Sequence, residues 1–138
     1  MLELKGTKID KLTPLHKVGD LVYFQGPLLS LYSDNNNALY LYDWAESDDE
    51  FNRWLVIKIT LETLSKYIHK NLSHYDLIRK SNEIYSVDID NNIMPHNIIQ
   101  LSKIPTEYLP DKSVYHDNDE CPNIKIIEEH IFKLLTTR

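Results

Sequence analysis

The chain has 138 residues, 42% of them hydrophobic and 26% charged, a composition typical of one globular domain. Its formal net charge is −6, from 15 basic and 21 acidic residues, which argues against a protein that mainly binds nucleic acid. No apolar run approaches the roughly 18–20 residues that a membrane span requires, so we expect no membrane partner.

The first half of the chain has the pattern of β-strands. Apolar and aromatic residues predict strands over 18–24, 28–32, 39–44 and 53–59, separated by turns rich in Gly, Pro, Asn and Asp. Because side chains alternate between the two faces of a strand, Leu39 and Leu41 should lie on one face and Tyr40, Tyr42 and Trp44 on the other.

The apolar period then becomes helical. Thr60 is suited to cap a helix over 61–72, and Ser73 a second, shorter helix. Alternation over 83–90 and an apolar run at 98–101 predict two more strands, and residues 124–135 a closing amphipathic helix. The expected fold is therefore α+β: an antiparallel sheet of about five to six strands with two short central helices and a C-terminal helix packed on one side.

We expect a single domain over 1–138. Residues 1–13 form an N-terminal extension, and the proline-containing stretch 105–123 forms an irregular arm. The lone cysteine, Cys121, and the absence of a secretory signal pattern predict a cytoplasmic protein.

The sequence carries no motif that assigns chemistry. Three glycines form no phosphate-binding loop, and six histidines show no zinc-binding spacing. The polar cluster from His116 to Cys121 is typical of a solvated loop, and Cys121 of an incidental thiol. We therefore predict no catalytic residue, no metal ligand and no cofactor.

Charge and aromatic residues are more informative. Residues 32–52 hold six acidic side chains and no basic one, whereas residues 53–80 hold six basic and two acidic ones. An uncovered row of Tyr and Trp beside such an acidic loop would mark a partner-binding surface. Alternatively, the 105–123 arm or the C-terminal helix covers the row. The candidate surface comprises Tyr40, Tyr42, Trp44, Glu46, Asp48, Asp49, Glu50, Arg53 and Trp54.

Part of the chain resembles a known family. Residues 26–29, 39–44 and 53–55, with the continuation 60–88, resemble an uncharacterised family of small stand-alone bacterial α+β proteins, over roughly residues 15–90. The resemblance implies a bacterial or phage origin and brings no activity and no site residues. Small proteins of this kind often serve as accessory or inhibitor proteins in mobile-element and antiviral defence loci.

Three functions remain in view. The leading hypothesis is a non-catalytic protein-binding module: a small acidic regulator, inhibitor or accessory subunit of a bacterial or phage assembly. It would bind another protein with a basic or mixed surface, or a second copy of itself. The alternatives are a metal-dependent nuclease or hydrolase that uses the acids between Asp43 and Glu50, and a sensor that binds a small ligand or nucleotide.

Overall fold

The structure is a computed structural model that describes residues 15–81, 83–90 and 95–136. In chain order its elements are β1 (His16–Tyr23), β2 (Pro27–Ser33), β3 (Leu39–Ser47), β4 (Phe51–Ile59), α1 (Leu61–Ile68), α2 (His74–Arg79), β5 (Ile84–Asp90), β6 (Pro95–Leu101), the 3₁₀ turns η1 (Thr106–Tyr108) and η2 (Asn118–Glu120), and α3 (Ile124–Thr136). Among the described residues, no helix combines the length and apolarity needed to cross a membrane.

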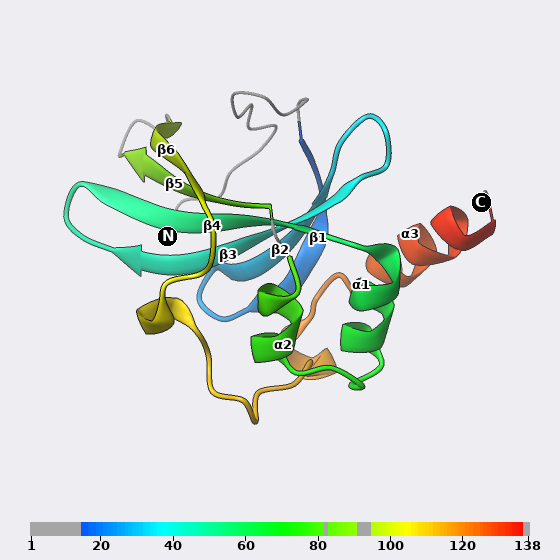
Figure 1. Cartoon of the computed structure of the whole chain (residues 1–138). Coiled ribbons are helices and arrows are strands. Elements are labelled where there is room, and N and C mark those ends of the chain that lie inside the picture. Colours follow the sequence, from blue (N-terminus) through cyan, green and yellow to red (C-terminus); the bar gives the residue numbers. More distant parts are fainter. Residues whose placement is uncertain (1–14, 82, 91–94, 137–138) are drawn as a thin grey trace.

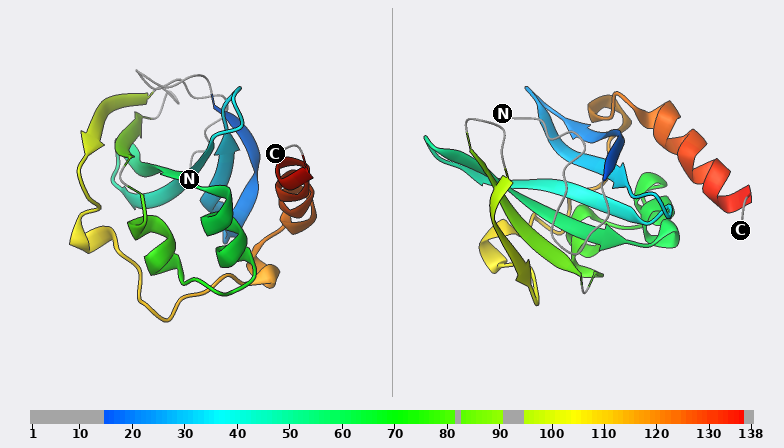
Figure 2. Two further views of the ribbon diagram at one scale, coloured as in Figure 1. Left: turned by 45° about the vertical axis from the view of Figure 1, so that its right-hand side comes forward. Right: turned by 90° about the horizontal axis from the view of Figure 1, so that it is seen from above.

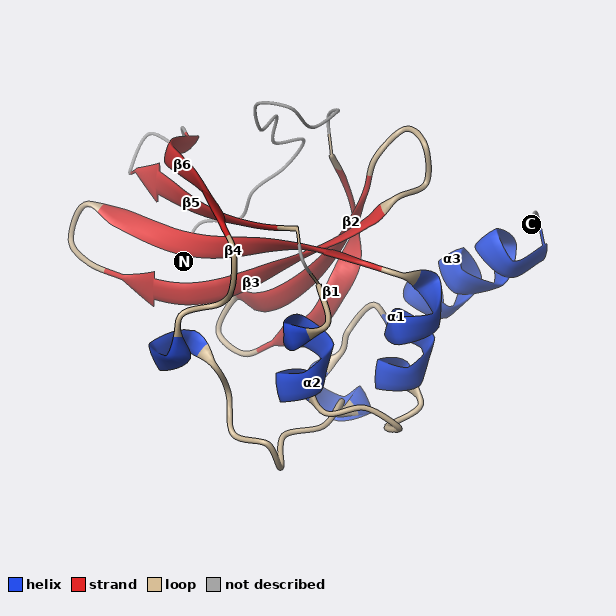
Figure 3. Cartoon of the chain, viewed as in Figure 1, coloured by secondary structure: helices blue, strands red, loops and turns tan. Residues whose placement is uncertain are grey.

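The six strands form one antiparallel sheet in the order β1-β2-β3-β4-β5-β6 (Figure 1). Each strand pairs with the next along the chain. Short turns join the first four strands, whereas α1 and α2 connect β4 to β5. Helices α1 and α2 lie on one side of the sheet, and α3 packs beside β1 (Figures 2 and 3). The predicted α+β fold is therefore confirmed.

The two faces of the sheet build two separate hydrophobic clusters. Leu39, Leu41 and Leu55 join the buried residues of all three α-helices in the first cluster. The second cluster, on the opposite face, consists of Leu15, Tyr32, Tyr40, Tyr42, Trp54, Val56, Tyr85, Val87 and Ile89. The predicted division of the β3 side chains between the two faces is confirmed, because a strand alternates its side chains regardless of what packs on them.

Local polar groups fix the turns and the helix ends. The Asp34 carboxylate accepts hydrogen bonds from the backbone N–H of Asn36 and Ala38, and Asn37 takes a positive φ in the β2–β3 turn. The hydroxyls of Thr60 and Ser73 accept from the backbone N–H three residues on, which caps α1 and α2 as predicted.

Some boundaries differ from the expected ones. β3 continues to Ser47 and β4 begins at Phe51, so the acidic loop shrinks to a turn at residues 48–50. β6 begins at Pro95, because an edge strand tolerates proline at its first position. The arm 105–123 contains η1 and η2 rather than being wholly irregular, and the extension 1–13 lies outside the described residues.

Candidate functional site

Three of the predicted aromatic site residues are buried in the second cluster. Tyr40, Tyr42 and Trp54 are 3%, 1% and 2% exposed, and the Tyr42 ring centroid lies 4.2 Å from that of Tyr32. Neither the 105–123 arm nor α3 supplies a described residue to this cluster, contrary to the alternative expectation, since both pack in the first cluster. These three rings are therefore not part of an exposed surface.

The acidic turn is exposed. Figure 1 shows the β3–β4 hairpin reaching beyond the neighbouring strands, with residues 48–50 at its tip. The Asp48 carboxylate accepts hydrogen bonds from the backbone N–H of Glu50 at 2.7 Å and of Phe51 at 3.0 Å, so Asp48 shapes the turn. Asp48, Asp49 and Glu50 are all exposed to solvent, and Trp44, nearer the base, is half-buried with its indole N–H donating to Asn52.

Arg53 lies close to the tip of the hairpin, where it pairs with Glu46. Its guanidinium donates two hydrogen bonds to the Asp88 carboxylate, at 2.7 and 3.0 Å, and one to Glu46 at 2.7 Å. The Tyr108 hydroxyl accepts from Arg53 at 3.0 Å and donates to Glu46 at 2.9 Å. The bonds to Asp88 and Tyr108 raise the pKa of Arg53, those to Asp88 most of all. Four elements (β3, β4, β5 and η1) are thereby joined at one point.

This network also divides the predicted acids by role. Glu46 is engaged by Arg53 and Tyr108, and Asp48 by its own turn, so both have structural partners. Asp88 and Tyr108 are not among the predicted site residues, and they lie 35 and 55 residues from Arg53 in the chain. The alternation over 83–90 was the one available signal, because it placed a carboxylate at residue 88 on the face opposite Val87.

A second group of polar side chains is buried between the sheet and the helices. Asp43 on β3 lies 3.7 Å from Nε2 of His74, and the Tyr67 ring meets the rings of His74 and His116 edge-on. His116 is 2% exposed, and burial lowers its pKa below the ordinary value. Neither ring nitrogen of His116 has a hydrogen-bond partner in the described part of the chain.

The acids that a nuclease would use are not brought together. Asp43 lies under the helices beside His74, whereas residues 48–50 lie at the exposed tip of the hairpin. In residues 15–81, 83–90 and 95–136, no three His, Cys, Asp or Glu side chains form a group that could hold a metal ion. The described residues thus include no group of three metal-binding side chains of the kind that the nuclease alternative would use.

Cys121 is buried and its thiol donates to the backbone carbonyl of Asp20 at 3.3 Å. Burial raises the pKa of Cys121 to about 11. A nucleophilic cysteine needs the opposite shift, because the thiolate is the reactive form. The environment of Cys121 is that of a structural side chain.

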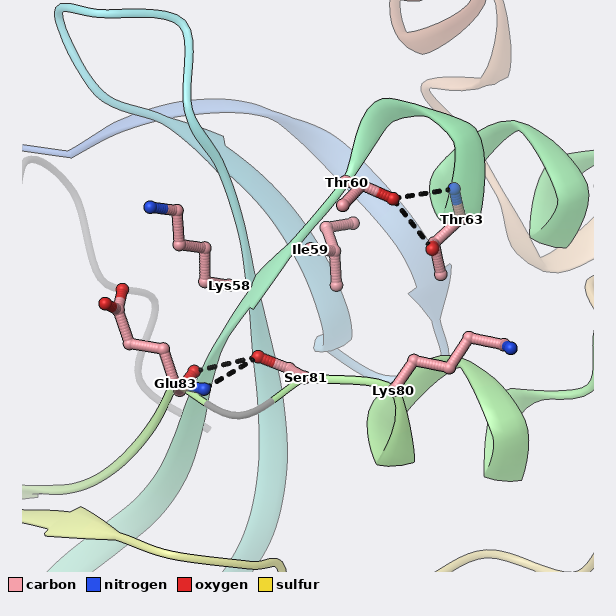
Figure 4. A pocket seen from close by; sticks show the side chains of 7 residues that line it. All are labelled: Lys58, Ile59, Thr60, Thr63, Lys80, Ser81 and Glu83. Atoms are coloured by element: carbon pink, nitrogen blue, oxygen red, sulfur yellow. Dashed lines mark hydrogen bonds between the residues drawn. The ribbon is translucent and has the colours of Figure 1, made fainter.

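Surface cavities open at several places in the described part of the chain. One, of about 290 Å³, lies between Lys58, the start of α1 and Ser81 (Figure 4). The Thr60 hydroxyl is bonded to Thr63 and the Ser81 hydroxyl to the backbone of Glu83, while the Lys80 side chain points away from Lys58. A second, of about 380 Å³, lies between β1 and α3, and a third, of about 410 Å³, between α2 and the segment after β6.

Comparisons of this chain with family models, with curated proteins and with solved structures find no match. The resemblance of residues 15–90 to a bacterial family stays a prediction. A function for this chain is therefore inferred from its own sequence and structure.

Proposed function

We propose that the chain is a non-catalytic, cytoplasmic protein-binding module: a small acidic regulator, inhibitor or accessory subunit of a bacterial or phage assembly. The observation that carries this proposal is the β3–β4 hairpin, whose tip presents exposed carboxylates at residues 48–50, while Arg53 next to the tip ties the hairpin to two other parts of the fold, β5 and η1. The hairpin would bind a basic surface of the partner.

The hydrogen bonds of Arg53 hold the hairpin in one shape close to its tip. Arg53 connects β4 to Asp88 on β5, to Glu46 on β3 and to Tyr108 on η1. A surface already held in its bound shape loses less conformational entropy on association, so its contacts contribute more of their energy to affinity.

Charge favours a basic partner. The chain has a net charge of −6, and no basic residue lies between positions 32 and 52. Such an acidic segment attracts a positive surface at long range and repels acidic proteins, which raises the association rate and the specificity. Phe51, directly after the turn, and Trp44, further along β3, are half-buried and would supply the apolar contacts that anchor an interface.

The test reverses the charge of the tip. In the variant Asp49→Lys, Glu50→Lys the turn retains Asp48, whose carboxylate shapes it. The matched control is Asp119→Lys, Glu120→Lys, which makes the same charge change at exposed residues of η2. Tagged wild-type and variant chains are used to capture partners from extracts of the host cell, and the affinity for the purified partner is then measured against salt.

We expect wild type and control to bind one partner, with affinity that falls as salt rises. The tip variant should bind it at least about tenfold more weakly, because like charges across an interface repel. Equal binding by the tip variant, while circular dichroism shows all chains folded, would remove the hairpin from the proposal. Failure to capture any partner specifically would contradict the binding module itself.

A further inference from the structure

The cavity of about 410 Å³ is a groove between α2 and the chain that follows β6. Tyr75 and Arg79 line it from α2, and Ser102, Lys103 and Thr106 from the other side. Figures 1 and 2 both show this segment running beside α2 on its way to η1. The side chains of Ile84, Ile104 and Leu109 supply the apolar part of the lining.

Positive charge gathers at this groove. The Arg79 guanidinium carbon lies 4.8 Å from the centroid of the Tyr75 ring, and the Lys112 ammonium 5.2 Å from the same centroid. Lys103 adds a third cation, and no carboxylate is among the lining residues. In the described part of the chain, none of these three cations forms an ion pair.

The nearby acidic residues do not cancel this charge at the lining. Asp76 on α2 and Glu107 on η1 belong to the same elements but are not lining residues. The Asp111 carboxylate, next to Lys112, accepts hydrogen bonds from the backbone N–H and the hydroxyl of Ser113. The cations of the groove are thus available to an anion from solution.

We propose that this groove binds a small molecule that carries a phosphate group, with Arg79 and Lys103 as its phosphate ligands. A guanidinium binds two phosphate oxygens at once, and an ammonium adds a point charge with three donors. Ser102 and Thr106 bring hydroxyl donors to the same groove, and Ile84, Ile104 and Leu109 accommodate the rest of the ligand. The volume lies in the range of small-molecule sites, roughly 300–1,000 Å³.

Two comparisons within the molecule favour a small ligand at this place. A nucleic acid strand would extend past the groove over a chain of net charge −6, which repels a polyanion, whereas a compact ligand meets only the basic lining. The cavity beside α1 also contains lysines, but the Glu83 carboxylate lines it too, and its Thr60 hydroxyl is already bonded to Thr63 (Figure 4).

The experiment uses the whole chain with AMP, inorganic phosphate and adenosine as probes. Isothermal titration calorimetry measures the binding of each probe. Arg79→Gln, Lys103→Gln removes two charges from the groove. Lys66→Gln, Lys125→Gln removes two charges from exposed positions on α1 and α3 and is the matched control. Both are compared with wild type at the same pH and ionic strength.

We expect AMP and inorganic phosphate to bind saturably and to compete with each other, and adenosine not to bind. The groove variant should bind AMP at least about tenfold more weakly than wild type, and the control as wild type does. If the double variant does not fold, Lys103→Gln alone gives the same comparison, because Lys103 is exposed.

Three results would overturn the proposal. The first is equal AMP affinity in wild type and a folded groove variant, and the second is no saturable binding of either AMP or phosphate. The third is binding of a single-stranded oligonucleotide together with failure to bind AMP, which would assign the groove to a polyanion instead. None of these results bears on the β3–β4 hairpin, since its test uses different residues.

Discussion

At the scale of single residues, Arg53 has more partners than the sequence indicated. It was expected beside the acidic turn as part of a binding surface, and the structure instead makes it the centre of a network. The Asp88 side chain is only 3% exposed, so its charge depends on the two bonds from Arg53. When a buried carboxylate loses its cationic partner, the free-energy cost of taking the carboxylate out of water is no longer compensated.

Replacing Arg53 should therefore destabilise the fold. We expect Arg53→Met to lower the free energy of unfolding by about 2–4 kcal/mol, measured by urea denaturation, because the Asp88 charge is left unpaired. Adding Asp88→Asn should restore part of the loss, since the unpaired charge is removed as well. A double variant as unstable as the sum of the two single variants would contradict the coupling between these side chains.

At the scale of elements, short helices depend on their caps. α2 spans only His74–Arg79, too few residues for a helix that is stable in isolation, and its N-terminal N–H groups need partners. The Ser73 hydroxyl accepts a hydrogen bond from the backbone N–H of Asp76 at 3.1 Å. The backbone N–H of His74 donates to the backbone carbonyl of Val114 in the arm. The cap and the arm together fix the start of α2.

Loss of this cap should be measurable. We expect Ser73→Ala to lower the free energy of unfolding by about 1 kcal/mol, because the part-buried hydrogen bond that caps α2 is lost. Ser47→Ala, at the exposed end of β3, is the matched control and should change it by less than about 0.5 kcal/mol. Equal effects in the two variants would show that the cap does not stabilise α2.

At the scale of the whole molecule, burial couples stability to pH. Burial is the largest influence on His116 and His130 and lowers the pKa of both. Around His116, the charge of Lys70 lowers the pKa further, whereas the charges of Asp117 and Glu128 raise it. The folded chain thus binds protons at these histidines less readily than the unfolded chain does.

The sign of the effect follows from linkage. Above the ordinary histidine pKa of about 6.5 both states are neutral at these positions and the stability is fully present. As the pH falls through that value, the unfolded chain takes up protons first, so we expect the free energy of unfolding to decrease. His116→Gln should reduce this decrease in urea unfolding between about pH 7.5 and pH 5.5. The exposed His16→Gln serves as control, and an identical pH dependence in wild type and His116→Gln would refute the assignment.

The candidate site was predicted only in part. The sequence located the acidic hairpin, because a run of acids between two strands is a local signal. It could not tell that Tyr40, Tyr42 and Trp54 are buried, since an aromatic strand face has the same pattern whether or not something covers it. Nor could it find the groove, whose lining residues Arg79 and Lys103 lie on segments separated by two strands of the sheet.

The sequence by itself determined the six strands and three α-helices, the division of β3 between two faces, the caps of α1 and α2 and the antiparallel pairing in the sheet. These depend on neighbours along the chain: side-chain period, turn chemistry and the short reach of a turn. Only the tertiary structure decided which side chains are covered, that Arg53 pairs with Asp88 and Tyr108, and that the basic groove forms. Those contacts join residues far apart in the chain, and packing of the whole fold, rather than any local pattern, brings them together.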